Sequence, residues 1–74
     1  MNITQLQEKF AKRLQELMRE KEIATISALA EKTGIPRNTI TNWVLHKRTP
    51  LIDALWKLSE YFGCSIDYLL GKEN

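Results

Sequence analysis

The sequence predicts an all-α protein, and three features carry that prediction. Apolar residues recur at intervals of three and four through most of the chain, which is the spacing of one buried helical face. Each of the three glycines follows such a run, where a helix can end in the left-handed conformation. No segment alternates apolar and polar residues as a half-buried strand does. We therefore expect five short helices in one compact bundle.

Length and composition indicate a single globular domain over residues 1–74. The chain has 74 residues, of which 43% are hydrophobic and 27% charged, as in ordinary soluble proteins. A core of this size is thin, so efficient packing or dimerisation is needed for stability. The N-terminal region has no continuous apolar stretch and carries Glu8, Lys9 and Lys12, which argues against a secretory signal or a membrane span. The cytoplasm is the expected location, with no membrane partner.

Helix ends can be predicted from capping residues and breakers. The first helix is expected over about residues 4 to 22, with its apolar face on one side. The fourth is expected to start at Pro50 and end at Gly63, and the fifth to bury Leu69 before ending at Gly71. Suitable side chains for the N-caps of these three helices are Thr4, Thr49 and Ser65.

The second and third helices are predicted to form a helix-turn-helix over about residues 25 to 46. Thr25 can cap the second helix, and Gly34 can end it near Thr33. The third helix is expected from Pro36 or Arg37 to about His46. Its buried face should carry Ile40, Trp43 and Val44.

Basic residues concentrate around this motif. The formal net charge of +2 is too small to identify a partner. No acidic residue occurs between Glu31 and Asp53, however, and that span contains Lys32, Arg37, Lys47 and Arg48. A local basic surface of this kind attracts phosphate.

The chain offers little for metal binding or catalysis. Cys64 is the single cysteine and is expected to be a small buried thiol, and His46 is the single histidine, without acidic or thiol neighbours spaced as metal ligands. No nucleophile, base or phosphate-binding loop is arranged for chemistry. We expect no enzymatic activity, no metal and no cofactor.

Taken together, these segments resemble the lambda-repressor-like (Cro/C1-type, XRE) family of helix-turn-helix DNA-binding proteins. The resemblance rests on the segment FAKRLQEL from Phe10, on Leu29-Ala30 with Gly34 and Ile40, on Pro50, and on the closing segment YFGCSIDYLLG from Tyr61. It implies a five-helix, lambda-repressor-like bundle from a bacterial or phage regulator, with the third helix in the major groove of DNA.

The sequence departs from the family pattern at three places. Ile26 stands where a phosphate-clamping glutamine is usual, so Thr25, Ser27 and the backbone N–H groups there would bind phosphate instead. Met18 and Val44 replace a common arginine–glutamate pair, and we expect these two to pack together. The third departure is His46, which replaces a glycine; the alignment also implies one extra residue between the first two helices.

The third helix carries side chains suited to reading bases. With Ile40 and Trp43 inward, Asn38 and Asn42 point outward. Asparagine can pair with adenine, arginine with guanine, and a threonine methyl can contact thymine. The resemblance implies base contacts from Arg37, Asn38 and Asn42, with Thr41 reading a base or holding a phosphate. Phosphate contacts are expected from Thr25, Ser27, Thr39, His46, Lys47 and Arg48. The alternative, that this face is merely solvated, stays open.

One domain of this size covers few base pairs, so we expect a homodimer on a palindromic operator. Surplus apolar residues suggest a dimer patch comprising Trp56, Tyr61, Phe62, Ile66 and Tyr68. Alternatively these residues all face inward, and both tryptophans are expected to be mainly core.

The leading function is sequence-specific binding of double-stranded DNA by a transcriptional repressor. An antitoxin or controller-type regulator is an alternative, as is a protein-interaction module that kept the fold without DNA. The acid-free span from Lys32 to Ile52 favours DNA, since an interaction module would not need it.

Overall fold

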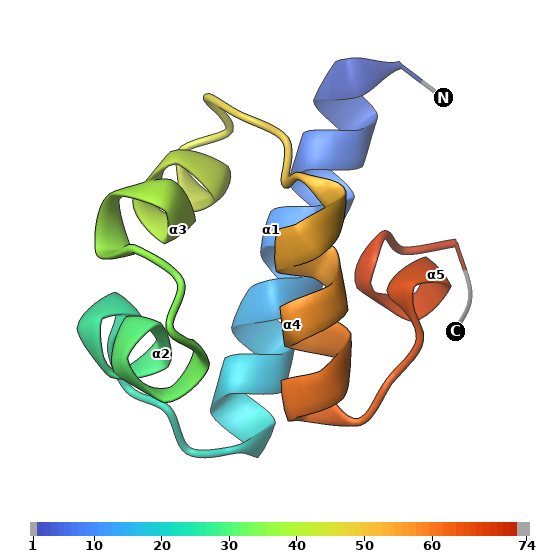
Figure 1. Ribbon diagram of the computed structural model, residues 1–74. Helices are drawn as coiled ribbons and strands as arrows, with labels where there is room; N and C mark the ends of the chain where they lie inside the picture. The colour runs from blue at the N-terminus through green and yellow to red at the C-terminus, as the bar shows by residue number, and fades with distance from the viewer. Residues whose placement is uncertain (1, 73–74) are drawn as a thin grey trace.

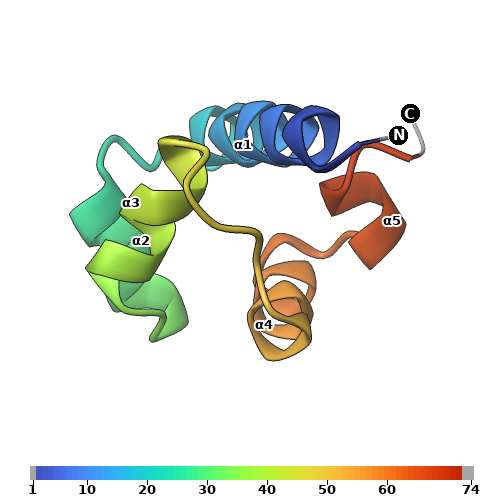
Figure 2. The same ribbon diagram turned by 90° about the horizontal axis from the view of Figure 1, so that it is seen from above.

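The computed structural model describes residues 2–72, and this part of the chain is helical with no strand. Its helices are α1 (Ile3–Glu20), α2 (Ile26–Thr33), α3 (Arg37–Val44), α4 (Ile52–Phe62) and α5 (Ile66–Leu69). Figures 1 and 2 show α1 along one side, α4 across from it, and the α2–α3 pair and α5 on opposite flanks. The all-α bundle predicted from the sequence is confirmed. None of these helices is long and apolar enough to cross a membrane.

All five helices contribute to one hydrophobic core. Phe10 and Leu14 of α1 are fully buried at its centre, together with Leu29, Ile40, Leu58 and Leu69 from the other helices. No polar or charged residue is buried in the described part of the chain. The core therefore depends on shape and apolar contact, which makes it sensitive to the loss of single side chains.

The first helix begins and ends earlier than predicted. Asn2, not Thr4, is its N-cap, and the Asn2 side chain accepts a hydrogen bond of 2.8 Å from the Gln5 N–H. At the other end Glu22 adopts a left-handed conformation with φ 56°. The N–H of Ile23 then donates to the carbonyl of Met18, which closes the helix in a Schellman motif. Glu22 therefore lies in the turn after α1, whereas the prediction had placed it inside the helix.

The start of α4 also differs from prediction. Thr49 and Pro50 lie in the extended connection before the helix, and Leu51 is the N-cap residue. No side chain caps the helix from this position; Asp53 instead accepts a hydrogen bond from the Ala54 N–H within the first turn. Prediction was wrong here because Thr49 and Pro50, two residues with capping preferences, were followed by one more residue of extended chain, Leu51.

The remaining caps agree with prediction. Gly34 and Gly63 take left-handed conformations directly after α2 and α4. The Thr25 hydroxyl accepts from the Ala28 N–H at 3.1 Å, and Ser65 caps α5 by accepting from the Tyr68 N–H at 3.0 Å.

The two tryptophans have opposite environments. Trp43 is 1% exposed, as expected, whereas Trp56 is 62% exposed, so the prediction of a mainly buried Trp56 was wrong. Leu55, Leu58 and Phe62 occupy the inward face of α4, and Trp56 lies about 100° around the helix from Leu55. Cys64 is half-buried rather than fully enclosed.

Candidate nucleic-acid interface

The turn between α2 and α3 is fixed by backbone and side-chain bonds. The Gly34 N–H donates to the Ala30 carbonyl at 2.8 Å in the left-handed cap. The Thr33 hydroxyl donates to the Leu29 carbonyl at 2.8 Å and accepts from the Ile35 N–H at 3.3 Å. Ile35 itself is buried, so the turn is tied to the core and sets the direction in which α3 leaves α2.

The rotation of α3 about its own axis is set by Ile40 and Trp43. Ile40 is completely buried, and the Trp43 ring meets Phe10 of α1 edge to face, with ring centroids 5.4 Å apart and planes at 74°. Such a contact has a preferred geometry that a purely aliphatic contact lacks. The opposite side of α3 must therefore face solvent.

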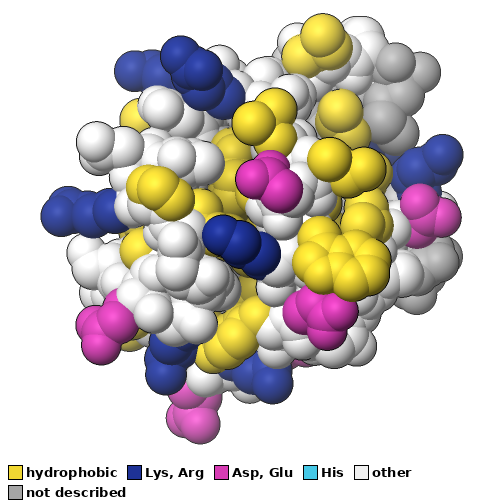
Figure 3. Space-filling model, in the orientation of Figure 1, with side chains coloured by type: hydrophobic (Ala, Val, Ile, Leu, Met, Phe, Trp, Pro, Cys, Tyr) yellow, Lys and Arg dark blue, Asp and Glu magenta, His cyan; other side chains and the backbone are white. Residues whose placement is uncertain are grey.

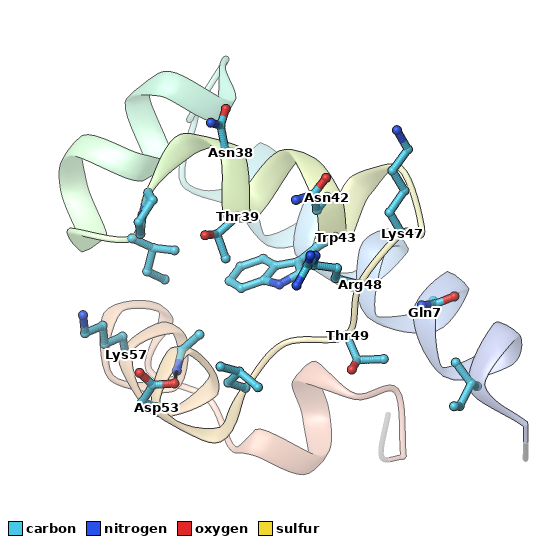
Figure 4. A pocket seen from close by; sticks show the side chains of 15 residues that line it. Gln7, Asn38, Thr39, Asn42, Trp43, Lys47, Arg48, Thr49, Asp53 and Lys57 are labelled. Atoms are coloured by element: carbon cyan, nitrogen blue, oxygen red, sulfur yellow. Dashed lines mark hydrogen bonds between the residues drawn. The ribbon is translucent and has the colours of Figure 1, made fainter.

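The four predicted base-reading residues lie on the outer part of α3. Arg37 and Asn38 are exposed, and Thr41 and Asn42 are half-buried one turn further along. In Figure 4 Asn38 and Asn42 point to the same side, away from α4. The Thr41 hydroxyl donates to the Arg37 carbonyl at 3.0 Å, which orients its side chain along the helix.

The predicted phosphate contacts fall into three groups. Thr25 and Ser27 are exposed at the start of α2, where the first backbone N–H groups have no helical acceptor. His46, Lys47 and Arg48 are exposed just after α3, and Lys47 points to the same side as Asn42 (Figure 4).

Thr39 forms the third group alone, because it points toward α4 rather than outward (Figure 4). It lines a groove of about 680 Å³ between α3 and α4, together with the indole of Trp43. Lys57 and Asp53 of α4 line the same groove. Sequence reasoning did not select Lys57, since nothing in its spacing showed that α4 would face α3.

The basic surface expected from the sequence is present. Lys32, Arg37, Lys47 and Arg48 are all exposed, and no acidic residue lies between Glu31 and Asp53 to offset them. Figure 3 shows Lys and Arg side chains over the α2–α3 side of the molecule. These positive charges surround the polar face of α3, which is an arrangement that attracts a long anionic ligand.

The connection after α3 explains one departure from the family pattern. His46 has φ 60°, the conformation that a glycine adopts at little cost. Its N–H donates to the Trp43 carbonyl, and the Lys47 N–H donates to the Asn42 carbonyl at 2.8 Å. This is a Schellman motif with histidine in the glycine position. The main chain therefore follows the turn that a glycine would make.

Met18 and Val44, which replace the common arginine–glutamate pair of the family, lie near one another. Met18 of α1 and Val44 of α3 line one shallow hollow, which they share with Ile26 at the start of α2. Met18 is buried and Val44 half-buried. The three side chains occupy the junction of α1, α2 and α3 with apolar surface.

The predicted dimer patch does not form one open surface. The Arg13 guanidinium lies 3.8 Å from the centroid of the Tyr68 ring, and the Lys21 ammonium lies 5.8 Å from that of Tyr61. Tyr61, Ile66 and Tyr68 are each half-buried, and Phe62 is buried. Among these residues Trp56 alone is widely exposed.

A helical bundle with a helix-turn-helix, whose second helix turns a polar and basic face outward, is typical of the class of small helix-turn-helix domains. A family model described as Helix-turn-helix matches residues 15–69. The chain therefore belongs to the XRE-type helix-turn-helix family.

The chain is also similar to the HTH-type transcriptional regulator ImmR of Bacillus subtilis (strain 168). The two are 44% identical over 62 residues, which cover 84% of this chain and 48% of that protein. The chain thus spans about half the length of this curated relative. No solved structure matches significantly.

Proposed function

We propose that this domain binds double-stranded DNA in a sequence-specific manner and represses transcription by occupying an operator that overlaps a promoter. In this proposal α3 lies in the major groove, with Arg37, Asn38, Thr41 and Asn42 toward the base edges. Thr25, Ser27, His46, Lys47 and Arg48 contact phosphates on either side. The protein acts as a homodimer on a palindromic site.

The main support for the proposal is that α3 has one buried apolar side and one exposed polar side. Its inner side is held by the buried Ile40 and Trp43, and its outer side carries polar side chains able to form paired hydrogen bonds with bases. Asparagine and threonine are poor helix formers, so a plain solvated helix face would favour other residues. Membership of the family and the likeness to a transcriptional regulator support the same function.

Thr39 keeps the phosphate contact that the sequence suggested, but at a different place on the surface. Because its side chain points toward α4, it contacts phosphate only where the backbone of the duplex passes over the groove between α3 and α4.

Selection of binding sites from random double-stranded DNA tests the proposal. The expected result is a short enriched sequence with two-fold symmetry, whose half-sites are about 34 Å apart, one turn of the duplex. Enrichment should be lost for a variant in which Asn38 and Asn42 are both alanine. A protein-interaction module would enrich no sequence, and that outcome would refute DNA recognition.

A further inference from the structure

The N-terminal half of α4 presents large apolar side chains to solvent. Leu51 is 73% exposed, Ile52 79% and Trp56 62%. Leu51 is the N-cap residue of α4, and Ile52 and Trp56 lie one turn apart in the helix. Figure 3 shows hydrophobic side chains gathered over the upper part of α4, on the face that α4 turns away from α1 in Figure 2. Contiguous exposed apolar surface of this kind marks a contact site, because its burial is favourable.

Charged residues flank this apolar surface in a self-complementary order. Asp53 and Lys57 are exposed, carry opposite charges and lie one turn apart on the same flank of α4. In a two-fold symmetric contact, each pairing between the partners occurs twice. An antiparallel α4 pair centred near Ala54 and Leu55 would place Asp53 beside the partner's Lys57 at both ends, and Ile52 beside the partner's Trp56.

We propose that a second copy of this chain covers this surface, so that the protein dimerises through antiparallel α4 helices. The contact consists of Leu51, Ile52 and Trp56 at its centre and the pairs formed by Asp53 and Lys57 at its edge. It differs from the patch suggested by the sequence, because the Tyr68 ring is covered by Arg13 of α1 and the Tyr61 ring lies beside Lys21, which follows α1.

The available area is sufficient for a reversible dimer. Three side chains with these exposures present on the order of 400 Å² of apolar surface, about half of what each partner buries in a standard interface. Asp53, Lys57 and the connection before α4 provide polar surface around them. An apolar centre with a charged rim is the usual anatomy of such interfaces.

The arrangement also suits the proposed function, on which this step of the argument rests. In Figure 1 α4 runs from top to bottom, and α2 and α3 lie together on its left. A half-turn about the horizontal direction in front of α4 makes the two α4 helices antiparallel and leaves both helix-turn-helix motifs on the same side.

Sedimentation equilibrium of the protein without DNA, from micromolar to millimolar concentration, tests the interface. The wild type is expected to dimerise, and Trp56→Ser to raise the dimer dissociation constant about 30-fold or more, as for a central tryptophan. Leu45→Ser is the matched control. Leu45 is 56% exposed but lies after α3 rather than in α4, so this variant should have the dimer dissociation constant of the wild type. Circular dichroism checks that both variants remain folded.

A charge exchange tests the antiparallel register. Asp53→Lys alone and Lys57→Asp alone each place like charges opposite one another in a homodimer, and both should weaken it. Mixing these two variants in equal amounts restores both opposite-charge contacts, so a heterodimer should form more tightly than either homodimer.

A wild type that stays monomeric at millimolar concentration, Trp56→Ser that dimerises like the wild type, or a mixture no tighter than its components would each overturn the α4 interface. DNA binding distinguishes this failure from failure of the proposed function. A protein that dimerises through α4 but binds DNA without sequence preference would support the interface and contradict the proposed function. A protein that binds DNA selectively but dimerises through another surface would support the function and contradict the interface.

Discussion

The ring of Phe10 meets the ring of Trp43 edge to face, with centroids 5.4 Å apart, and so joins the middle of α1 to the inner side of α3. Phe10→Leu should lower the free energy of unfolding by about 1–2 kcal/mol, because it keeps most of the apolar volume but loses the aromatic contact. It should also weaken DNA binding by the folded protein, since α3 would be less firmly oriented. Denaturant titration and DNA titration measure the two effects.

Phe62→Leu is the control for this variant. Phe62 is also buried and also makes an edge-to-face contact, with Tyr61 at a centroid distance of 5.0 Å, but it lies at the end of α4. Its loss of stability should be similar and its DNA affinity unchanged. Equal effects of both variants on DNA affinity would contradict a special role for Phe10.

His46→Gly should stabilise the protein. His46 holds φ 60°, where a residue with a Cβ is strained by about 1–2 kcal/mol, whereas glycine pays a smaller entropic cost. We expect a gain of about 0.5–1 kcal/mol, or a rise of a few degrees in Tm for a domain of this size. Thermal unfolding followed by circular dichroism measures it.

Lys12→Gly provides the comparison, because Lys12 is exposed inside α1. Glycine should cost about 1 kcal/mol there. A loss of stability in both variants would show that the left-handed turn at His46 is not strained.

Gly34→Ala tests the turn of the helix-turn-helix. A methyl group at this position would meet nothing within 4 Å, so its cost comes from the backbone conformation, φ 77°, alone. The expected loss is about 1–2 kcal/mol. Gly34→Asn should lose less, because asparagine tolerates the left-handed region better. Chemical denaturation of both variants would decide; an alanine variant as stable as the wild type would argue that the turn readily takes another form.

Asn42→Ala and Lys47→Ala should affect DNA binding in different ways. If Asn42 pairs with a base, its loss should relax selectivity at one base pair by about 1–3 kcal/mol. If Lys47 contacts phosphate, its loss should weaken binding to all sequences alike and reduce the slope of log affinity against log salt by about one. Titrations of selected and scrambled duplexes at several KCl concentrations separate the two. Affinity of the wild type that is independent of salt would contradict the phosphate contact of Lys47, and unchanged selectivity of Asn42→Ala would contradict the base contact of Asn42.

The helices and most of the core could be predicted because their signals are local. The three- and four-residue spacing of apolar residues identified α1 to α5, and Thr25, Gly34, Gly63 and Ser65 marked ends that the structure confirms. The left-handed turn at Glu22 could not be seen in this way, because glutamate rarely adopts that conformation, and the one signal for the turn at His46 was that this residue stands where the family has a glycine. They follow from the tertiary packing of the helices on each side.

The candidate site was predictable in part for the same reason. The outward direction of Asn38 and Asn42 follows from helical periodicity once Trp43 is placed inside. The groove with Lys57 depends on how α4 packs beside α3, and the exposure of Trp56 depends on which side of α4 meets the core. A helix with apolar residues on more than one side does not reveal from its sequence which of them will be covered.

The hydrogen bond from the Thr41 hydroxyl to the Arg37 carbonyl restricts the contacts that Thr41 can make with a base pair. The single proton of that hydroxyl is already used, so Thr41 can offer only its methyl group and an oxygen lone pair to a partner. Thymine presents a methyl group in the major groove, and adenine and cytosine present amino groups, whereas guanine presents acceptors only. Thr41 should therefore discriminate against guanine at the position it faces, by the lack of a donor rather than by size.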